Sequence, residues 1–430
     1  MGPDPPSSRS GLSRSEWGLI LVLVAVQFTH MVDFVIIMPL GERLMDELRL
    51  TEPQFGQIVS AYAWAAGLAS LAASLVMDRF DRRTVLLTMY AGFAVSTLFC
   101  GLAPDYTLLL VSRTLAGMFG GVAAVALMTV IGDVFPPEKR GRATGAVMSA
   151  FAVASILGVP IGLALTDAFG RGAPFLALAG LSAAVWVFGW LRLPHVRGHL
   201  GEQRSGRLAE FAAVVREPNH IRAFAFTFFL VLGTFTVASF IAPYLSSWNG
   251  WRERHLLVIY FVAGLGTLAA MNITGRLADR YPRRPLYVGL ASVALVLAVV
   301  ISNLPPGPLW VATLVLTLFM VFASARAVPA QAILLGAAAP RVRGAFLSVN
   351  TAVQHLGVGV APLIAGSLTG RDAAGHLTGF GLVGLVSAGT GAVSLLLVWL
   401  VRPAAEDVSA VVVPQHPTAE HEPEPKPTAV

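Results

Sequence analysis

Long apolar runs, separated by short segments with charged residues, glycine or proline, dominate the pattern along the whole chain. A helix needs about 20 apolar residues to cross the hydrocarbon core of a bilayer, and each run approaches or exceeds that length. A continuous segment of this length satisfies its backbone in lipid as a helix. We therefore predict twelve transmembrane helices, at residues 17–40, 54–77, 84–103, 107–132, 143–168, 173–193, 219–245, 255–278, 285–304, 308–338, 344–369 and 377–401.

The longest internal polar stretch, His195 to Asn219, divides these runs into two groups of six. We expect an all-α integral membrane protein whose twelve helices form two six-helix pseudo-symmetric bundles. The tail is rich in Pro and Glu and has no apolar period, which is typical of disorder. The expected divisions are a cytoplasmic N-terminal segment (1–16), an N-terminal bundle (17–194), a cytoplasmic linker (195–218), a C-terminal bundle (219–403) and a disordered cytoplasmic tail (404–430).

Composition agrees with a lipid environment. Hydrophobic residues make up 55% of the chain and charged residues only 13%, against about 25% charged residues in soluble domains. A net charge of +6 would suggest nucleic acid as a partner of a soluble protein, but excess Lys and Arg also mark cytoplasmic loops, so we expect no nucleic-acid partner. The single cysteine, Cys100, excludes an intrachain disulfide and two-cysteine metal sites, and we expect neither a metal nor a cofactor.

The distribution of basic residues predicts the orientation in the membrane. Most of the 30 Lys and Arg residues fall on the side of the termini. Because cytoplasmic loops carry the excess of Lys and Arg, we expect both termini in the cytoplasm and a multi-pass protein of the bacterial inner membrane. The opposite loops hold only Arg43, Arg49, Arg171, Arg252, Arg254 and Arg371.

A polar motif occurs twice, once in each predicted bundle, and its matching residues are separated by a constant offset. Parallel repeats of this kind are typical of a large class of transporter folds. Asp78, Arg79, Arg82 and Arg83 follow the second run, and Gly275, Asp279, Arg280, Arg283 and Arg284 follow the eighth.

This paired motif resembles the loop signature of the major facilitator superfamily, Gly-x-x-x-Asp-Arg-x-Gly-Arg-Arg. Ser74 replaces the first glycine of the first copy, and Asp81 and Pro282 replace the second glycine of each copy. The resemblance implies that these loops lock the cytoplasmic ends of the two bundles while the bundles rock. An alternative is that the arginines act only as topology anchors.

Two glycine-containing stretches resemble motifs of the family's efflux members. In the fourth run an arginine is followed by Gly117 and Gly121, and in the fifth run Gly158, Pro160 and Gly162 resemble the Gly-Pro motif of proton-coupled exporters. The second match is incomplete, because Val159 stands where glycine is expected. Glycine and proline permit close helix approach and bending. Close packing alone is therefore an equal alternative to a role in transport direction.

Ionisable residues inside the predicted helices are few. Each costs about 2.5–3.5 kcal/mol on insertion scales, so it normally faces a partner or an aqueous cavity. Gln27, His30 and Asp33 are spaced by three in the first run and share one helical face. The family resemblance implies that helices one, four, seven and ten line a central cavity, and Asp33, Arg113 and Arg326 lie in three of them.

Asp33 and Arg113 both lie ~10 Å below the outer boundary, which suggests a pair or a shared cavity. Our hypothesis is that Asp33 binds the transported proton and that Arg113 modulates its proton affinity; the alternative is a static pair. Arg326 has no carboxylate at comparable depth in the second half, so we expect it to contact an anionic substrate group, a backbone carbonyl or the interface. Pro329 is expected to kink the helix beside it.

These patterns predict a secondary active transporter that exports small organic molecules by proton antiport with alternating access, and not an enzyme. We expect a monomer whose partners are a small-molecule substrate, protons and the lipid bilayer. An importer or uniporter of the same fold, and a non-transporting receptor, stay open as alternatives. An intramembrane enzyme or ATP-driven pump is disfavoured, because no catalytic constellation or phosphate-binding glycine loop occurs. Further candidates for the cavity lining are Gln27, Tyr62, Tyr244, Asn350 and Gln354.

Overall fold

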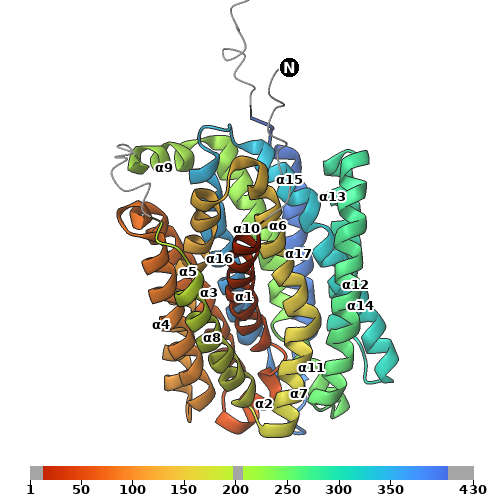
Figure 1. Cartoon of the computed structure of the whole chain (residues 1–430). Helices are drawn as coiled ribbons and strands as arrows, with labels where there is room; N and C mark the ends of the chain where they lie inside the picture. Colours follow the sequence, from red (N-terminus) through yellow and green to blue (C-terminus); the bar gives the residue numbers. More distant parts are fainter. Residues whose placement is uncertain (1–12, 197–206, 405–430) are drawn as a thin grey trace, which may run out of the picture.

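The computed structural model describes residues 13–196, which we call the N-half, and residues 207–404, the C-half. Both halves are helical, and their helices run roughly side by side between two ends of the molecule (Figure 1). The N-half contains α1 (Arg14–Ile36), α2 (Gly41–Leu48), α3 (Glu52–Val76), the 3-10 helix η1 (Met77–Arg79), α4 (Arg82–Leu102), α5 (Tyr106–Val134), α6 (Pro137–Val153), the π-helical turn η2 (Ala154–Gly158), α7 (Val159–Phe169) and α8 (Ala173–Arg192).

The C-half repeats this plan after one additional short helix. Two short strands, which pair antiparallel, connect its last two long helices outside the spans. The C-half contains α9 (Arg207–Arg216), α10 (Pro218–Ala238), α11 (Ile241–Asn249), α12 (Glu253–Arg280), α13 (Arg283–Ser302), α14 (Leu309–Ala325), α15 (Ala327–Ala337), α16 (Arg343–Leu368), β1 (Gly370–Arg371), β2 (Leu377–Thr378) and α17 (Phe380–Leu400).

The described chain has 12 helical segments long and apolar enough to cross a membrane, as the apolar runs predicted. Three of them consist of consecutive helices: Pro137–Phe169, Pro218–Asn249 and Leu309–Ala337. Helix α9 occupies part of the predicted linker. The rest of the linker (197–206), the predicted tail beyond residue 404 and the first 12 residues lie outside the described part of the chain.

Local sequence explains where several helices begin. Ser13 and Glu16 form a capping box at α1, because the Ser13 hydroxyl accepts a bond from the Glu16 N–H while the Glu16 carboxylate accepts one from the Ser13 N–H. Thr51 and Gln54 form the same arrangement at α3. Each cap satisfies backbone donors that have no partner within the helix.

The break between α14 and α15 falls at Arg326, three residues before Pro329. Proline lacks a backbone N–H, and its ring clashes with the carbonyl four residues earlier, here that of Ala325. The kink expected from Pro329 is therefore confirmed. It places the Arg326 side chain where the helix axis changes direction.

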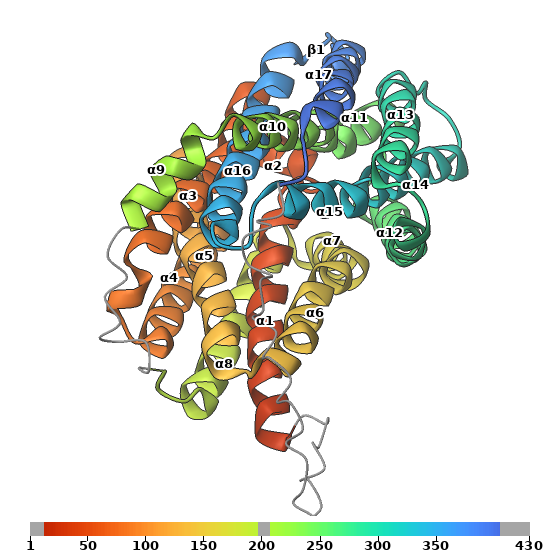
Figure 2. The same ribbon diagram turned by 90° about the horizontal axis from the view of Figure 1, so that it is seen from above.

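The two halves meet along two pairs of helices: α3 lies beside α16, and α7 lies beside α12 (Figure 2). Glycines permit the close approach of α3 and α16. A Cβ atom on Gly56 would collide with the Pro362 carbonyl oxygen, and one on Gly366 would lie 2.6 Å from the Glu52 carbonyl oxygen. The interface between the halves is thus a tight helix contact, and it positions the site described next.

Candidate functional site

Asp33 of α1 and Arg113 of α5 form an ion pair in the interior of the N-half. Arg113 Nη1 lies 2.9 Å from Asp33 Oδ2 and also donates to the Asp33 backbone carbonyl at 3.1 Å. Thr97 donates a longer bond of 3.5 Å to the other carboxylate oxygen. Both charged side chains are 0% exposed. The structure therefore joins the two residues whose depths in the sequence match, and it points neither of them at lipid.

Aromatic residues surround this pair and leave polar atoms without partners. The Arg113 guanidinium carbon lies 4.2 Å from the centre of the Tyr62 ring, a cation–π contact. The His30 ring lies 6.1 Å from that of Tyr62 and 5.9 Å from that of Phe93, measured between centroids. Among described residues, both His30 ring nitrogens, the Tyr62 hydroxyl and Arg113 Nε and Nη2 are buried without a hydrogen-bond partner. The N-half thus holds a cluster of unused donors and acceptors.

Among the described residues of the C-half, Arg326 is the buried charged side chain, with only 2% of its surface exposed. Its Nη2 atom donates to the Leu230 carbonyl at 3.2 Å and to the Thr234 hydroxyl, both on α10. Of the contacts expected from the sequence, the backbone carbonyl is therefore present. Its Nε and Nη1 atoms have no partner among the described residues.

The weaker cavity candidates occupy different places. Gln27 is buried in α1, and Asn350 is buried in α16, where it accepts a bond of 2.7 Å from Thr227. Gln354 is half-buried on the same helix as Asn350. Tyr244 lies in α11, packs against the Phe380 ring in a tilted arrangement and donates to the Leu304 carbonyl at 2.8 Å. Its hydroxyl is therefore occupied within the C-half and does not join the Asp33 cluster.

The family-like glycines lie at close helix contacts within the N-half. A Cβ atom on Gly117 would collide with the Tyr62 carbonyl oxygen, and one on Gly121 would lie 2.5 Å from that of Ala66. Similarly, a Cβ atom on Gly158 would collide with Val32, and one on Gly162 would lie 2.5 Å from Ile36. Pro160 is at the start of α7, directly after the π-helical turn. Close packing, one of the two roles left open by the sequence, is thus present at all four glycines.

The repeated loop motif makes matching contacts in each half. Arg82 pairs with Asp133 of α5 at 2.9 Å, and Arg83 donates to the Trp190 carbonyl near the end of α8. In the C-half, Arg283 donates to the Ala332 carbonyl of α15 and Arg284 to the Val401 carbonyl after α17. Each of these bonds joins the start of one helix to another helix or its end in the same half. Four other motif residues make no such contact among the described residues: Arg79, Asp279 and Arg280 are exposed, and a Cβ atom on Gly275 would meet open space. The Asp78 side chain lies outside the described part of the structure.

Asp81, which replaces the motif glycine in the first copy, caps α4. Its carboxylate accepts bonds from the Arg83 and Val196 N–H groups and lies 2.6 Å from His195 Nδ1. Although burial opposes them, these bonds lower the pKa of Asp81 to about 2. The departure from the family pattern thus adds an anchor between the α3–α4 loop and the end of α8.

Ion pairs between the halves lie at the end of the molecule opposite the termini, around the short helix α2. Arg371 of the C-half pairs with Glu42 at 2.9 Å and with Glu52 at 3.0 Å, and Arg43 of α2 pairs with Glu253 of α12 at 3.0 Å. We call these five residues the latch. The described ion pairs near the termini, such as that of Lys139 with Glu16, stay within the N-half.

Aromatic residues close the space beneath the latch. The Phe55 and Phe240 rings, one from each half, meet edge to face with centroids 5.4 Å apart and are fully buried. Deeper in the bundle, the rings of Phe34 and Phe235 meet across the same boundary with centroids 6.0 Å apart.

The sequence analysis did not predict the latch. The sequence contains one signal for it, namely the four charged residues within the eight residues of α2.

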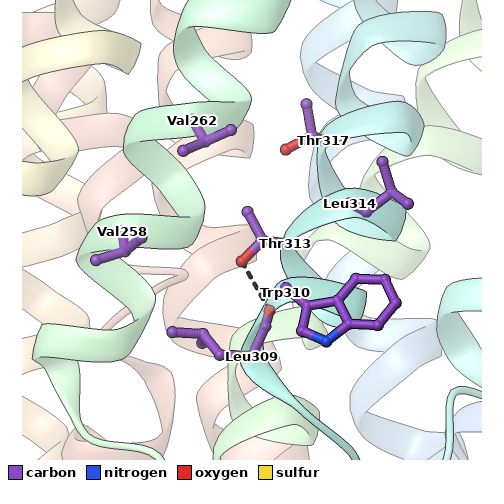
Figure 3. Close-up of a pocket in the computed structure, with 7 residues that line it drawn as sticks. All are labelled: Val258, Val262, Leu309, Trp310, Thr313, Leu314 and Thr317. Atoms are coloured by element: carbon purple, nitrogen blue, oxygen red, sulfur yellow. Dashed lines mark hydrogen bonds between the residues drawn. The ribbon is translucent and has the colours of Figure 1, made fainter.

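An apolar groove on the C-half has a different character. It has a volume of about 590 Å³ and is lined by residues of α12 and of α14 with the residues just before it (Figure 3). These two helices stand at the edge of the molecule (Figure 2). Val258, Leu314 and Trp310 line it and are 44%, 51% and 68% exposed. Its Thr313 hydroxyl is already bonded to the Leu309 carbonyl at 2.8 Å. The groove opens on an exposed apolar face of the C-half and holds none of the candidate charges.

The family of the chain can be decided by comparison with known proteins. The model of the Major Facilitator Superfamily matches residues 23–316 and 223–425, which together cover most of the sequence. The chain belongs to the Major Facilitator Superfamily. It is therefore a multi-pass membrane transporter of small molecules and not an enzyme.

Curated relatives of this superfamily member match it over most of their length. A probable sugar efflux transporter of Mannheimia succiniciproducens is 24% identical over 90% of this chain and 95% of the relative. An uncharacterized MFS-type transporter of Bacillus subtilis is 26% identical over 84% of this chain and 92% of the relative. These names refer to efflux and transport by the relatives.

Solved structures share the fold at lower identity. A bacterial homologue of the human lysosomal transporter Spinster, in an inward-facing and unoccupied conformation, aligns with a TM-score of 0.76 and 17% identity over 91% of this chain and 98% of its own. A D-xylose–proton symporter aligns with a TM-score of 0.72 and 16% identity over 90% and 98%. Both likenesses support two bundles of six membrane helices.

Proposed function

We propose that this superfamily member exports small organic molecules across the bacterial inner membrane in exchange for protons. One observation carries the proposal: a fully buried carboxylate, Asp33, is paired with a fully buried arginine, Arg113. Burying two charges costs free energy that a static pair of this kind often fails to recover. A role in binding the transported proton accounts for keeping a carboxylate at this depth.

In this mechanism a proton from outside binds Asp33 and weakens its bond to Arg113. Substrate binding from the cytoplasm returns Asp33 to the ionised state, in which Arg113 stabilises it. The bundles rock once in the proton-bound state and once in the substrate-bound state, so that proton and substrate cross the membrane in opposite directions. Arg113 also contacts Tyr62, whose unpartnered hydroxyl lies next to the same pair. Protonation of Asp33 therefore alters the surroundings of Tyr62, whose ring also contacts Phe34 at the boundary between the halves.

The latch supports an inward-facing state with both termini in the cytoplasm. With that orientation, the ion pairs of Arg371 and Arg43 close the outer end of the molecule. Export then requires these pairs to break once in each cycle. The efflux names of the relatives favour export, and they make sugars the first compounds to test.

Vesicle transport tests this proposal. Inverted membrane vesicles that contain the chain should accumulate substrate when the lumen is made more acidic than the outside, so that protons leave as substrate enters, and accumulation should stop when the gradient is dissipated. The Asp33→Asn variant should lose the dependence on the gradient. Full proton-driven accumulation by that variant would remove Asp33 from the role. Accumulation in right-side-out cells instead would favour the importer alternative.

A further inference from the structure

Arg326 carries a positive charge that nothing described in the protein balances. No carboxylate among the described residues lies within ion-pair distance, 4.0 Å, of its guanidinium group. Among the described residues of the spans, the fully buried carboxylate Asp33 is paired with Arg113, and the buried Glu52 is paired with Arg371. The bonds of Arg326 to Leu230 and Thr234 use one nitrogen and leave Nε and Nη1 free. An uncompensated buried charge of this kind is costly unless a partner arrives.

The position of Arg326 points to a partner from outside the protein. Its acceptors on α10 lie beside the contact with the other half. Phe235, the residue after Thr234, contacts Phe34 of α1, and Leu230 packs against the same small cluster of residues from both halves as Phe34. The Arg326 side chain is 2% exposed, so it does not reach lipid. The free donors of Arg326 therefore lie in the C-half close to the boundary between the halves.

The N-half presents a second set of free polar atoms. They are the His30 nitrogens, the Tyr62 hydroxyl and two Arg113 nitrogens. Phe34 lies between the two sets of free polar atoms. Its ring centroid is 5.6 Å from that of Tyr62 in the N-half and 6.0 Å from that of Phe235, which follows Thr234 in the C-half. A molecule bound between the halves would meet arginine donors from both of them.

The sum of these charges restricts the substrate. With Asp33 ionised, Asp33 and Arg113 cancel and Arg326 leaves one positive charge; with Asp33 protonated, two positive charges remain. Like charges repel strongly in a poorly hydrated interior, so a cation is disfavoured in both states. Oxygen atoms of hydroxyl or carboxylate groups instead accept the N–H bonds that the arginine fork offers.

We propose that the substrate is an oxygen-rich molecule without positive charge, and that Arg326 binds one of its hydroxyl or carboxylate groups. The proposal rests on the transport function proposed above, and it names the substrate class of that transporter. It does not depend on proton coupling, because the charge of Arg326 is the same in a uniporter. The competing explanation is that Arg326 only fastens the α14–α15 break to α10.

Three probes of similar size separate these possibilities: phenyl glucoside, phenyl glucuronide and phenyl glucosaminide, which are neutral, anionic and cationic at pH 6, the pH of the measurement. Binding is measured at equilibrium on purified full-length protein in lipid nanodiscs, with no proton gradient. We expect the glucoside and the glucuronide to bind at least about tenfold more tightly than the glucosaminide. Equal binding of all three, tighter binding of the glucosaminide, or binding of none overturns the proposal.

Variants then assign the selectivity to Arg326. Arg326→Gln should weaken binding of the glucoside. It should also bring the affinities of the glucoside and the glucosaminide to within about threefold of each other. Arg326→Lys keeps the charge and loses the fork, so it should keep the preference while all three probes bind more weakly. Arg192→Gln, at an exposed arginine of α8, is the control and should change nothing. A purely structural role predicts that Arg326→Gln lowers the melting temperature and leaves the preference intact, which would refute the assignment.

Because no gradient is present, failure here is distinct from failure of the proposed function. Loss of gradient-driven accumulation in the Asp33→Asn variant concerns coupling, and it leaves the order of the three affinities unchanged. Conversely, a transporter that proves to be proton-coupled but binds the glucosaminide best would retain the function and lose this inference.

Discussion

Arg371 Nη2 lies 2.9 Å from Glu42 Oε2, across the boundary between the two halves. The same guanidinium reaches Glu52 at 3.0 Å and Asp46 at 4.0 Å, so a single cation faces three carboxylates. These carboxylates all belong to the N-half, two of them on α2. Within the latch, Arg371 is therefore the cation that holds Glu42 and Glu52 of the N-half, while Arg43 and Glu253 form a separate pair.

We predict that Arg371→Gln opens the α2 end of the molecule. Removing the cation leaves three carboxylates close together without their partner, and their repulsion disfavours the closed state. Reaction of a cysteine placed at Ser246, which is buried in α11, measures the opening in a Cys100→Ala background. We expect labelling to be roughly tenfold faster, which corresponds to about 1.4 kcal/mol.

The matched control for this experiment is Arg254→Gln, which removes an exposed arginine at the same end. It should leave the labelling rate of the cysteine at position 246 unchanged. An equal rate in the Arg371→Gln variant and in its parent would show that the latch does not hold the halves together.

In contrast to the loss of Arg371, removing the charge of Glu42 should stabilise the fold. Burial raises the pKa of Glu42 and outweighs Arg371, which lowers it, while Asp46 and Glu52 raise it further. A carboxyl group whose pKa in the folded chain exceeds its ordinary 4.5 binds the proton more tightly when folded, so its ionised form destabilises the fold as the pH rises above 4.5.

Glu42→Gln should therefore melt higher than the wild type at pH 7, by roughly 1–2 °C. The difference should shrink as the pH falls toward 4.5, because wild-type Glu42 then takes up its own proton. Melting curves between pH 4.5 and 8 in detergent measure this directly. A variant that melts lower than the wild type throughout this range would show that the ion pair with Arg371 outweighs burial.

Single and double variants of Asp33 and Arg113 separate proton coupling from static pairing. Arg113→Gln leaves the Asp33 carboxyl group buried without its partner, so we expect the variant to lose about 3–5 kcal/mol of stability. Asp33→Asn combined with Arg113→Gln removes both charges, so stability should largely return. Gradient-driven transport should stay absent from the double variant. Recovery of both properties together would favour the static pair.

The sequence predicted the architecture well because the bilayer imposes a simple rule on it. Runs of about 20 apolar residues form helices whatever their neighbours are, and the 12 helical spans follow those runs closely. The pairing of Asp33 with Arg113 was within reach too, because depth follows from residue count. The latch could not be predicted in this way, since Glu42 and Arg371 are 329 positions apart and only the packing of the two halves brings them together.

The structure also resolves a question that spacing alone left open at Tyr244. An aromatic residue near the end of a span fits either a cavity wall or a packed core, and the sequence does not distinguish them. In the structure its hydroxyl donates to the Leu304 carbonyl, and its ring packs tilted against that of Phe380 with centroids 4.6 Å apart. Side-chain direction depends on where the chain turns between α10 and α11, which residue types alone do not specify.

Two glycines of α5 test whether close packing is what the family-like glycines provide. A Cβ atom on Gly117 would collide with the Tyr62 carbonyl of α3, whereas one on Gly132 would meet nothing within 4 Å. Gly117→Ala should therefore cost about 1–3 kcal/mol through overpacking. Gly132→Ala should be neutral or stabilise by up to about 1 kcal/mol, because alanine is the better helix former. Since Tyr62 contacts Arg113, the first substitution should also slow transport, and thermal unfolding measured alongside transport rates shows whether the two losses occur together. Equal stability of the two variants would mean that α3 and α5 move apart at no cost, and that these glycines serve something other than close contact.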